Sequence, residues 1–296
     1  MTQRYELRTE DERYPRALRE EEGVRAEVLY VLGDPDVLQE PMVSVIGARK
    51  ATPYGVAVAQ MAGRIAGECG ITVVSGGAMG CDYAASKAAL DAGGKTVIVC
   101  GNGADRIYPA SSEDVFRNAV KHGGAIVSIE PWGTPPAKYT FPKRNVIIAA
   151  LSPVLLVAEA GERSGTMGTV DAALEMGRTI YAAPGSVFSP TSQGTNRLIR
   201  DGALPITSEP DLEARLSLDY GVLRVIAPRQ KRDVGEVISA LTANPMRPEE
   251  LAPRLGKTVL TLLRTLTDYE AQGIVERLPD GRYSLTARAY QEYAQE

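Results

Sequence analysis

Three glycine- and hydroxyl-rich loops, each following an apolar run typical of a buried parallel strand, could bind an anion: Gly47, Ser75-Gly76-Gly77 and Ser164-Gly165-Thr166. Where such a loop leads into a helix, unpaired backbone N–H groups and the positive end of the helix dipole face a ligand at the strand's end. Arg49 follows the first loop, where a side chain has little structural role. We therefore predict a site for a phosphate-type anion. Capping of the next helix remains an equally good interpretation of Ser164-Gly165-Thr166, and the G-x-G-x-x-G spacing of a dinucleotide site is missing.

A second segment interleaves cations with aromatic rings: Lys138-Tyr139, then Phe141, Lys143, Arg144 and Asn145. Such a pattern suits a single-stranded nucleic acid, because its phosphates pair with cations while its unpaired bases stack on rings. For Phe141 taken alone, packing under the edge of a sheet is the more common role.

Composition excludes several other classes of function. The 296 residues are 44% apolar, with a net charge of −4 and a pI near 5.4, so a nucleic-acid site must be a local basic patch. His122 is the only histidine, which excludes a Ser-His-Asp triad and a multi-histidine metal site. The three cysteines lack metal spacing and are expected to be buried thiols. We predict no catalytic set, no metal, no cofactor, no membrane partner, and a cytoplasmic location.

Apolar runs and helical periodicity alternate along the first 215 residues. Strands are expected at 43–46, 71–74, 96–100, 125–128, 154–158, 179–182 and 204–206, and helices at 56–68, 114–121, 144–150, 164–176 and 194–201, with a loop at 135–142. This alternation predicts an α/β fold with a doubly wound, extended Rossmann-like sheet. The loops described above would then gather at the carboxyl edge of that sheet.

Four segments divide the chain. We expect a lead-in at 1–42 that packs on the sheet, a Rossmann-like domain at 43–215, a linker at 216–232 that contains a basic cluster at 229–232, and a small winged helix-turn-helix domain at 233–296. The last segment predicts helices at 234–241, 248–255 and 258–272 and then a hairpin. It carries seven basic and ten acidic residues, 7 − 10 = −3, which disfavours duplex binding and favours a protein-contact or regulatory role.

The assembled motifs resemble the DNA-processing protein A family, also called DprA or Smf. The matching pieces occur in the family's order over about 160 residues: 45–49, 54–55, 75–82, 88–90, 101–103, 108–109, 141–148, 159–160, 164–166, 183–185, 194–196 and 202–203.

The resemblance implies a function without catalysis. Members bind single-stranded DNA, form homodimers, and help to load the RecA recombinase during natural transformation. It also implies that Arg49 contacts DNA, as do the basic positions Lys138 and Arg144, and Asn145 matches too. The predicted DNA- or phosphate-binding residues are Gly47, Arg49, Ser75, Gly76, Lys138, Phe141, Lys143, Arg144, Asn145, Ser164, Gly165 and Thr166.

Four positions depart from the family pattern: Val146 stands for an arginine, Ser86 for a histidine and Cys81 for an isoleucine, and 110–112 lacks an asparagine. Loss of one charge-assisted contact is worth roughly 1.5–3 kcal/mol, so Val146 is expected to weaken DNA binding.

Two other classes of function stay open. In the first, the chain binds or hydrolyses a small nucleotide, with 164–166 cradling a phosphate and Asp82 or Glu159 acting as acid or base. In the second, it is mainly a protein-interaction scaffold that uses its acidic C-terminal domain.

Overall fold

The computed structural model describes residues 3–21, 23–24, 26–224 and 235–293. Two compact units are present, Met1–Ala51 with Val58–Ile226, and Thr52–Ala57 with Ala227–Glu296. Residues 216–220, expected to begin the linker, continue helix α8 (Glu209–Tyr220) instead. The basic cluster at 229–232 lies outside the described residues.

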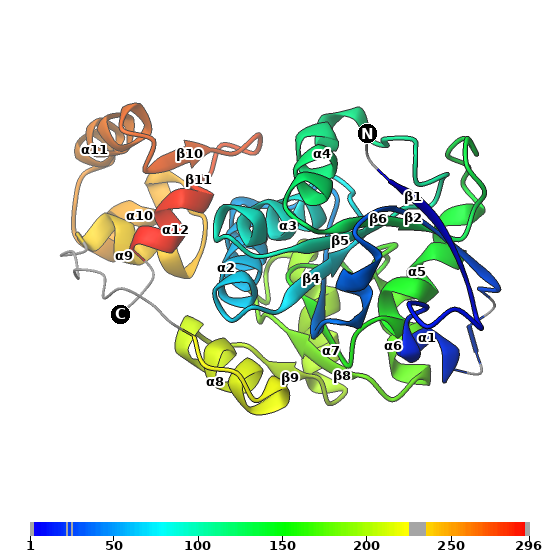
Figure 1. The fold of residues 1–296 in the computed structure, drawn as a ribbon. Helices are drawn as coiled ribbons and strands as arrows, with labels where there is room; N and C mark the ends of the chain where they lie inside the picture. Colours follow the sequence, from blue (N-terminus) through cyan, green and yellow to red (C-terminus); the bar gives the residue numbers. More distant parts are fainter. Residues whose placement is uncertain (1–2, 22, 25, 225–234, 294–296) are drawn as a thin grey trace. The chain divides into compact units, whose positions relative to one another are not determined.

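A nine-stranded sheet forms the centre of the first unit (Figure 1). Its strands are β1 (Arg4–Arg8), β2 (Val28–Gly33), β3 (Met42–Ile46), β4 (Thr72–Ser75), β5 (Thr96–Val99), β6 (Ala125–Ser128), β7 (Val154–Val157), β8 (Thr179–Ala182) and β9 (Leu204–Pro205). The order is β1-β2-β6-β5-β4-β3-β7-β8-β9. From β6 to β9 the strands are parallel, and β1 and β2 add an antiparallel edge. The predicted doubly wound α/β fold is confirmed.

The strand order reverses between β3 and β7. From β3 the chain builds β4, β5 and β6 in one direction, and then returns to place β7 on the other side of β3. In open sheets of this kind, the crossovers leave a crevice at the carboxyl ends of the two strands where the order reverses, and ligands bind there. The loops after Ile46 and Val157 therefore border the expected ligand position.

Helices cover both faces of the sheet. They are α1 (Arg16–Arg19), α2 (Pro53–Glu68), α3 (Cys81–Asp91), α4 (Glu113–Lys121), α5 (Thr140–Ala150), α6 (Met167–Glu175), α7 (Gln193–Arg200) and α8, with short 3-10 turns at Pro35–Gln39, Ala110–Ser112 and Pro190–Ser192. Strand β5 shows the two faces, because Val97 and Val99 join the core cluster that contains α5 and α6, whereas Ile98 packs with Phe116 of α4. Figure 1 shows α5 and α6 across the sheet from α3 and α4.

The segment 1–42 contributes strands to the sheet, beyond packing on it. Strands β1 and β2 pair with each other, and β2 pairs with β6. The hydroxyl of Tyr14, itself 1% exposed, donates to the Ala26 carbonyl at 2.5 Å and fastens the connection between the two strands.

Strand β3 is tied to helix α5 by a buried serine. The Ser44 hydroxyl donates to the Ile148 carbonyl at 2.7 Å, and the Ser44 N–H donates to the Ser152 hydroxyl at 3.1 Å. A buried hydroxyl without a partner would be costly, so these bonds fix how α5 lies against the central strand. They also set the position of the basic residues in the first turns of α5.

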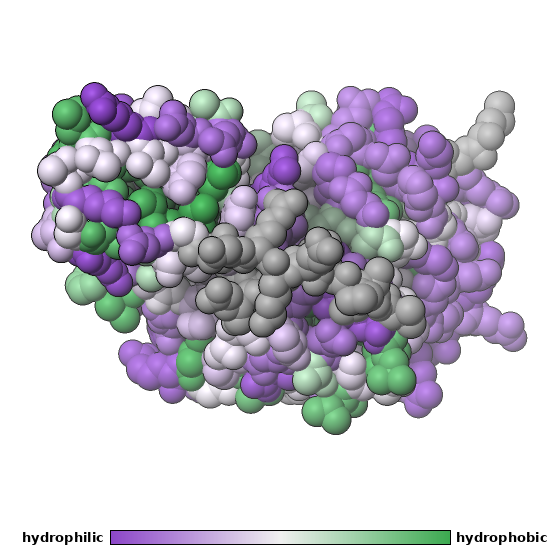
Figure 2. Space-filling model, turned by 90° about the vertical axis from the view of Figure 1, so that its left-hand side faces the viewer, coloured by the Kyte–Doolittle hydropathy of each residue, from purple (hydrophilic) through white to green (hydrophobic). Residues whose placement is uncertain are grey.

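The second unit contains α9 (Glu236–Ala243), α10 (Pro248–Leu255), α11 (Val259–Ala271), the hairpin β10 (Val275–Arg277) and β11 (Tyr283–Leu285), and α12 (Ala287–Tyr293). Three helices followed by a hairpin is the order expected from the sequence, and the winged-helix assignment stays a prediction. Among the described residues, no helix is both long and apolar enough to cross a membrane. On the face drawn in Figure 2, apolar side chains form small groups among hydrophilic ones.

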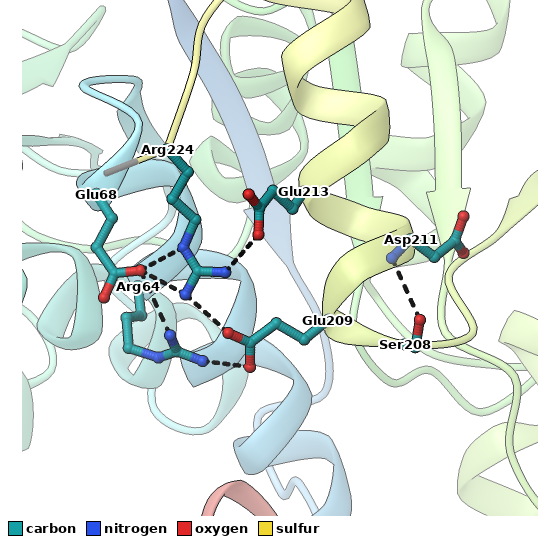
Figure 3. Close-up of polar contacts among 7 residues, drawn as sticks. All are labelled: Arg64, Glu68, Ser208, Glu209, Asp211, Glu213 and Arg224. Carbon is teal, nitrogen blue, oxygen red and sulfur yellow. Dashed lines mark hydrogen bonds and ion pairs between the residues drawn. The ribbon is translucent and has the colours of Figure 1, made fainter. Parts of the chain in front are cut away.

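Five charged residues form a network between α2, α8 and the segment after α8 (Figure 3). Arg224, whose side chain is 1% exposed, donates to Glu68 at 2.6 Å, to Glu209 at 2.7 Å and to Glu213 at 2.9 Å. Arg64 donates to Glu209 at 2.6 Å from the other side. The guanidinium is desolvated and compensated by three carboxylates, so its removal would leave them with mutual repulsion.

The network makes stability depend on pH. Burial by itself would raise the pKa of the Glu209 carboxyl, but hydrogen bonds from Arg64 and Arg224 outweigh it and hold the pKa below its ordinary value. A carboxyl whose pKa is lower in the folded state adds stability above its unfolded pKa, and that stability is lost as the pH falls through the folded pKa.

We expect Arg224→Met to lower the free energy of unfolding by about 3–5 kcal/mol at neutral pH, because it removes one side of a buried ion network. The deficit should shrink below about pH 4, where the carboxylates become protonated in both proteins. Urea unfolding at several pH values measures it. Arg200→Met is the matched control, since Arg200 pairs with Asp201 at the surface with its side chain 73% exposed, and it should leave the midpoint unchanged. A deficit that does not vary with pH would contradict the role given to Glu209.

Candidate nucleic-acid interface

A pocket of about 390 Å³ lies at the carboxyl ends of β3 and β7, where the strand order reverses. Seven of the twelve predicted site residues line it: Gly47, Arg49, Arg144, Asn145, Ser164, Gly165 and Thr166. Its charged lining consists of three cations, Arg49, Lys50 and Arg144, and one carboxylate, Asp82. The net charge of these groups is 3 − 1 = +2, a local positive site on an acidic chain.

Arg144 is the buried cation of this pocket. The residue is 5% exposed, and its Nε is buried without a hydrogen-bond partner within the described part of the chain. Burial lowers the pKa of its guanidinium, and the Asp82 charge opposes that change. Burial likewise raises the pKa of Asp82, against the effect of Arg144 and of backbone N–H groups. The opposite charges of Arg144 and Asp82 therefore compensate each other's desolvation, and the Nε–H of Arg144 has no acceptor among the described residues.

The glycine loop after β4 is what makes room for Arg144. A Cβ added to Gly76 would lie 1.7 Å from Nη1 of Arg144 and 2.6 Å from an Asp82 carboxylate oxygen. The Gly76 N–H donates to that carboxylate at 3.1 Å. Gly76, predicted to bind an anion directly, thus holds Asp82 and Arg144 in place behind the pocket.

Phe141 lies between two cations. Its ring centroid is 5.5 Å from Cζ of Arg49 and 6.0 Å from Cζ of Arg144. The expectation that the helix begins at Arg144 was wrong, because α5 begins at Thr140. Phe141 and Arg144 are then three residues apart on one helical face, which accounts for their contact. The ring of Tyr108, a residue 46% exposed, is 6.0 Å from that of Phe141.

Hydrogen bonds tie the β3 and β7 loops together. Thr166 donates its hydroxyl to the Gly47 carbonyl at 3.0 Å, and Ser164 accepts the Thr166 N–H at 3.2 Å. The Ala48 N–H donates to the Glu159 carbonyl at 2.8 Å. These bonds shape the wall of the pocket and fix the loop that carries Arg49.

Four predicted residues lie outside this pocket lining besides Phe141. Ser75 is buried and donates its hydroxyl to the Val45 carbonyl at 2.7 Å, and Gly76 lies behind Arg144. Lys138 is exposed in the loop before α5, and the Lys143 ammonium lies 5.7 Å from the centre of the Tyr139 ring. Both lysines are exposed, and Lys143 lines a cavity separate from this pocket.

The sequence prediction missed Lys50, which lines the pocket beside Arg49. Its signal was adjacency to Arg49, which lies two residues after Gly47 at the end of a strand. Arg49 and Lys50 are exposed and, like Lys138 and Lys143, form no ion pair with a carboxylate of the described residues. These cations are therefore available to an external anion.

Val146 does not face this pocket. It packs against the main core cluster and lines a different cavity, together with Tyr30, Ile129 and Lys143. An arginine at this position would thus point away from Arg49. Valine in place of the family's arginine at position 146 therefore does not reduce the positive charge of the pocket.

The two candidate acid–base residues are both engaged inside the protein. Asp82 accepts the Gly76 N–H, and Glu159 accepts the Thr191 hydroxyl at 2.8 Å. All three cysteines are buried and unpaired by disulfides, as the sequence predicted, and burial raises the pKa of the Cys100 thiol to about 11. Within the described residues, His, Cys, Asp and Glu side chains form no cluster that could hold a metal.

Comparison with known proteins identifies the family. The family model described as DNA recombination-mediator protein A matches residues 6–217, which include strands β2 to β9, part of β1 and the whole pocket. This chain belongs to that family. The family's description is that of a mediator of DNA recombination and not of an enzyme.

Individual relatives of the family agree with this assignment. Protein Smf of Escherichia coli is 34% identical over 86% of this chain and 70% of its own length. DNA processing protein DprA of Streptococcus pneumoniae is 38% identical over 63% of this chain and 66% of its own, and its X-ray structure has a TM-score of 0.66, with 71% of this chain and 73% of that chain covered. The chain thus spans about two thirds of the length of these relatives.

A third member of the family was solved in a study of its DNA binding. The structure of DNA processing protein A from Helicobacter pylori is described as giving insight into a unique single-stranded DNA binding mode. It is 29% identical to this chain, with a TM-score of 0.66, and covers 74% of this chain and 99% of that one.

We expect Gly76→Ala to lower the free energy of unfolding by about 1–3 kcal/mol, because the methyl group would overlap the Arg144 guanidinium and force it out of its place. Urea unfolding measures the loss. Gly165→Ala is the matched control, since nothing lies within 4 Å of a Cβ added at that pocket-lining glycine, and its stability should equal or slightly exceed that of the natural protein. Equal stability of the two variants would show that Arg144 does not pack against Gly76.

Proposed function

We propose that this protein is a recombination mediator that binds single-stranded DNA in DNA uptake and natural transformation, protects the strand, and helps to load the RecA recombinase. We also propose that it acts in the cytoplasm as a homodimer. The observation that carries the DNA-binding part is the pocket at the strand-order reversal, where a buried arginine with an unsatisfied Nε meets exposed, unpaired cations. Family membership and the DNA-binding relative from Helicobacter pylori support it.

A backbone phosphate suits the pocket because each lining group has a distinct part in holding it. Arg144 supplies a desolvated guanidinium whose hydrogen bonds are stronger than those formed in water. Arg49 and Lys50 are exposed and meet the strand from solvent. A guanidinium offers several N–H donors in a planar fork that matches phosphate oxygens, so Arg49 and Arg144 together would fix the strand's position.

Aromatic rings and lysines beside the pocket extend the proposed contact. Phe141, held between Arg49 and Arg144, and the exposed Tyr139 are platforms for unpaired bases. Lys138 and Lys143 would contact the adjoining phosphates. Stacking of this kind tolerates any base, so we propose binding without strong sequence preference.

The RecA contact and the homodimer rest on the family rather than on a surface of this chain. For the C-terminal residues 233–296, we propose a winged-helix domain with a protein-contact or regulatory role. Its net charge of −3 disfavours binding to the DNA backbone.

We expect Arg49→Ala to weaken binding of a fluorescent oligo-dT by roughly 10- to 100-fold, the equivalent of one or two charge-assisted contacts. The slope of log K against log salt should also fall by about 0.7, the value for one phosphate contact on a single strand. Anisotropy titrations at two or more salt concentrations measure both quantities. Arg49 is a cleaner probe than Arg144, because Arg49 is exposed and its loss leaves the fold intact.

Arg200→Ala is the matched control, because Arg200 is exposed at the end of α7 and does not line the pocket. It should bind like the natural protein. Failure of the natural protein to bind oligo-dT at low salt would refute the proposal. Thermal stabilisation by mononucleotides in that case would support a small-nucleotide site instead.

A further inference from the structure

An exposed phenylalanine lies at the same carboxyl edge of the sheet, outside the pocket. Phe188 is 89% exposed, the highest value among the large apolar side chains in the described part of the chain. The chain has three phenylalanines, of which Phe116 is fully buried and Phe141 adjoins the pocket. An aromatic ring this exposed buries little area within the fold, and both of its faces are open to a ligand.

The segment around Phe188 is a braced turn. The Ser189 N–H donates to the Ser186 carbonyl at 3.0 Å, which places Val187 and Phe188 at the two central positions of a β-turn. Asn196 holds the base of the turn, because it accepts the Gly185 N–H at 3.0 Å and donates to the Gly185 carbonyl at 2.9 Å. The ring is thus presented on a fixed support, and little ordering would be lost on binding.

Direct contacts connect this turn to the pocket. Glu159 accepts the Ala48 N–H with its carbonyl at 2.8 Å and the Thr191 hydroxyl with its carboxylate at 2.8 Å, so one buried residue joins the loop of Arg49 to the Phe188 loop. A Cβ added to Gly161 would lie 3.2 Å from the Pro190 carbonyl oxygen. The loop 161–166, which lines the pocket with its last residues, therefore packs directly against the loop that carries Phe188.

The intervening loop also supplies a cation. Arg163 is exposed, and no carboxylate of the described residues pairs with it. Arg163 and Phe188 thus place an exposed cation and an exposed ring on two loops that pack against each other. Alternation of phosphate-pairing cations and base-stacking rings is what a single strand requires.

We propose that Phe188 is a second stacking platform, on which an unpaired base lies after the strand has left the Arg49–Arg144 pocket, with Arg163 contacting the phosphate between them. The inference rests on the proposed function. It assigns the path of the DNA strand along the sheet edge, from the end of β3 past β7 to β8. The ligand is a single strand longer than the pocket alone can hold.

The test compares a short and a long oligo-dT on the full chain, about six and about twenty nucleotides, one within and one beyond the roughly 4–16 nucleotides that a single OB-fold binds. Phe188→Ala should weaken binding of the long oligonucleotide by about 5- to 150-fold, the usual effect of losing one stacked base, and leave the short one unchanged. Phe188→Trp should keep full affinity. Phe188→Leu is the discriminating control, because leucine keeps the apolar surface and removes the aromatic face, so it should behave like Phe188→Ala.

Arg49→Ala separates the two proposals, since it should weaken both lengths. If it does so while Phe188→Ala binds both lengths like the natural protein, the second platform is refuted and the pocket stands. If Arg49→Ala binds both lengths normally, the pocket assignment itself fails. Three other results would each overturn the inference. The first is full affinity of Phe188→Leu, and the second is an equal loss of affinity for both lengths with Phe188→Ala. The third is a change in oligomeric mass, measured by light scattering, with unchanged DNA binding. The last result would assign the ring to contact with a second copy of the chain.

Discussion

One buried charge, the guanidinium of Arg144, is the constraint on which the site depends. Removing such a group from water costs several kcal/mol unless charge and hydrogen bonds compensate it. Asp82 supplies the opposite charge, and Gly76 supplies both a backbone donor for Asp82 and the space that a side chain would fill. The hydrogen bond from Ser44 to the Ile148 carbonyl fixes α5 against β3 and so positions Arg144 at the sheet edge. Helix, central strand and glycine loop must therefore all be in place before the pocket exists.

The distribution of charge matters more than its sum. The chain carries a net charge of −4, yet a polyanion that approaches the β3–β7 edge meets cations with no internal partner. Arg224, in contrast, is neutralised within the fold by the three glutamates around it. The same residue type thus has opposite roles. Arg224 fixes the segment after α8 to α2, whereas Arg49 is held by its loop and faces solvent. Because screening shortens electrostatic range to about 8–10 Å in physiological salt, the local arrangement decides what binds.

Departure from a family pattern has different consequences at different positions. Val146 lies on the side of α5 that faces the core and a separate cavity, so it leaves the pocket's charge intact. Cys81 lies against Gly47, where an added Cβ would come within 2.6 Å of its sulfur. Ser86 is buried and accepts a hydrogen bond from Thr96 at 3.2 Å. At each of these positions the residue present is accommodated by its own neighbours, and none of them lines the pocket.

By itself the sequence determined the fold class, the parallel strands, the buried cysteines, and most of the loops that border the pocket. It could do so because apolar periodicity and glycine positions are local properties of the chain, and because parallel strands necessarily bring their carboxyl ends to one edge. It did not determine the start of α5, since helix ends depend on capping and packing as well as on propensity. Nor could it separate Arg49, which faces solvent, from Gly76 and Ser75, which support the pocket from behind. Those assignments depend on the reversal of strand order between β3 and β7 and on which face each side chain presents. Both are set by contacts between segments about a hundred residues apart, such as Ser44 with Ile148, and only the tertiary structure decides them.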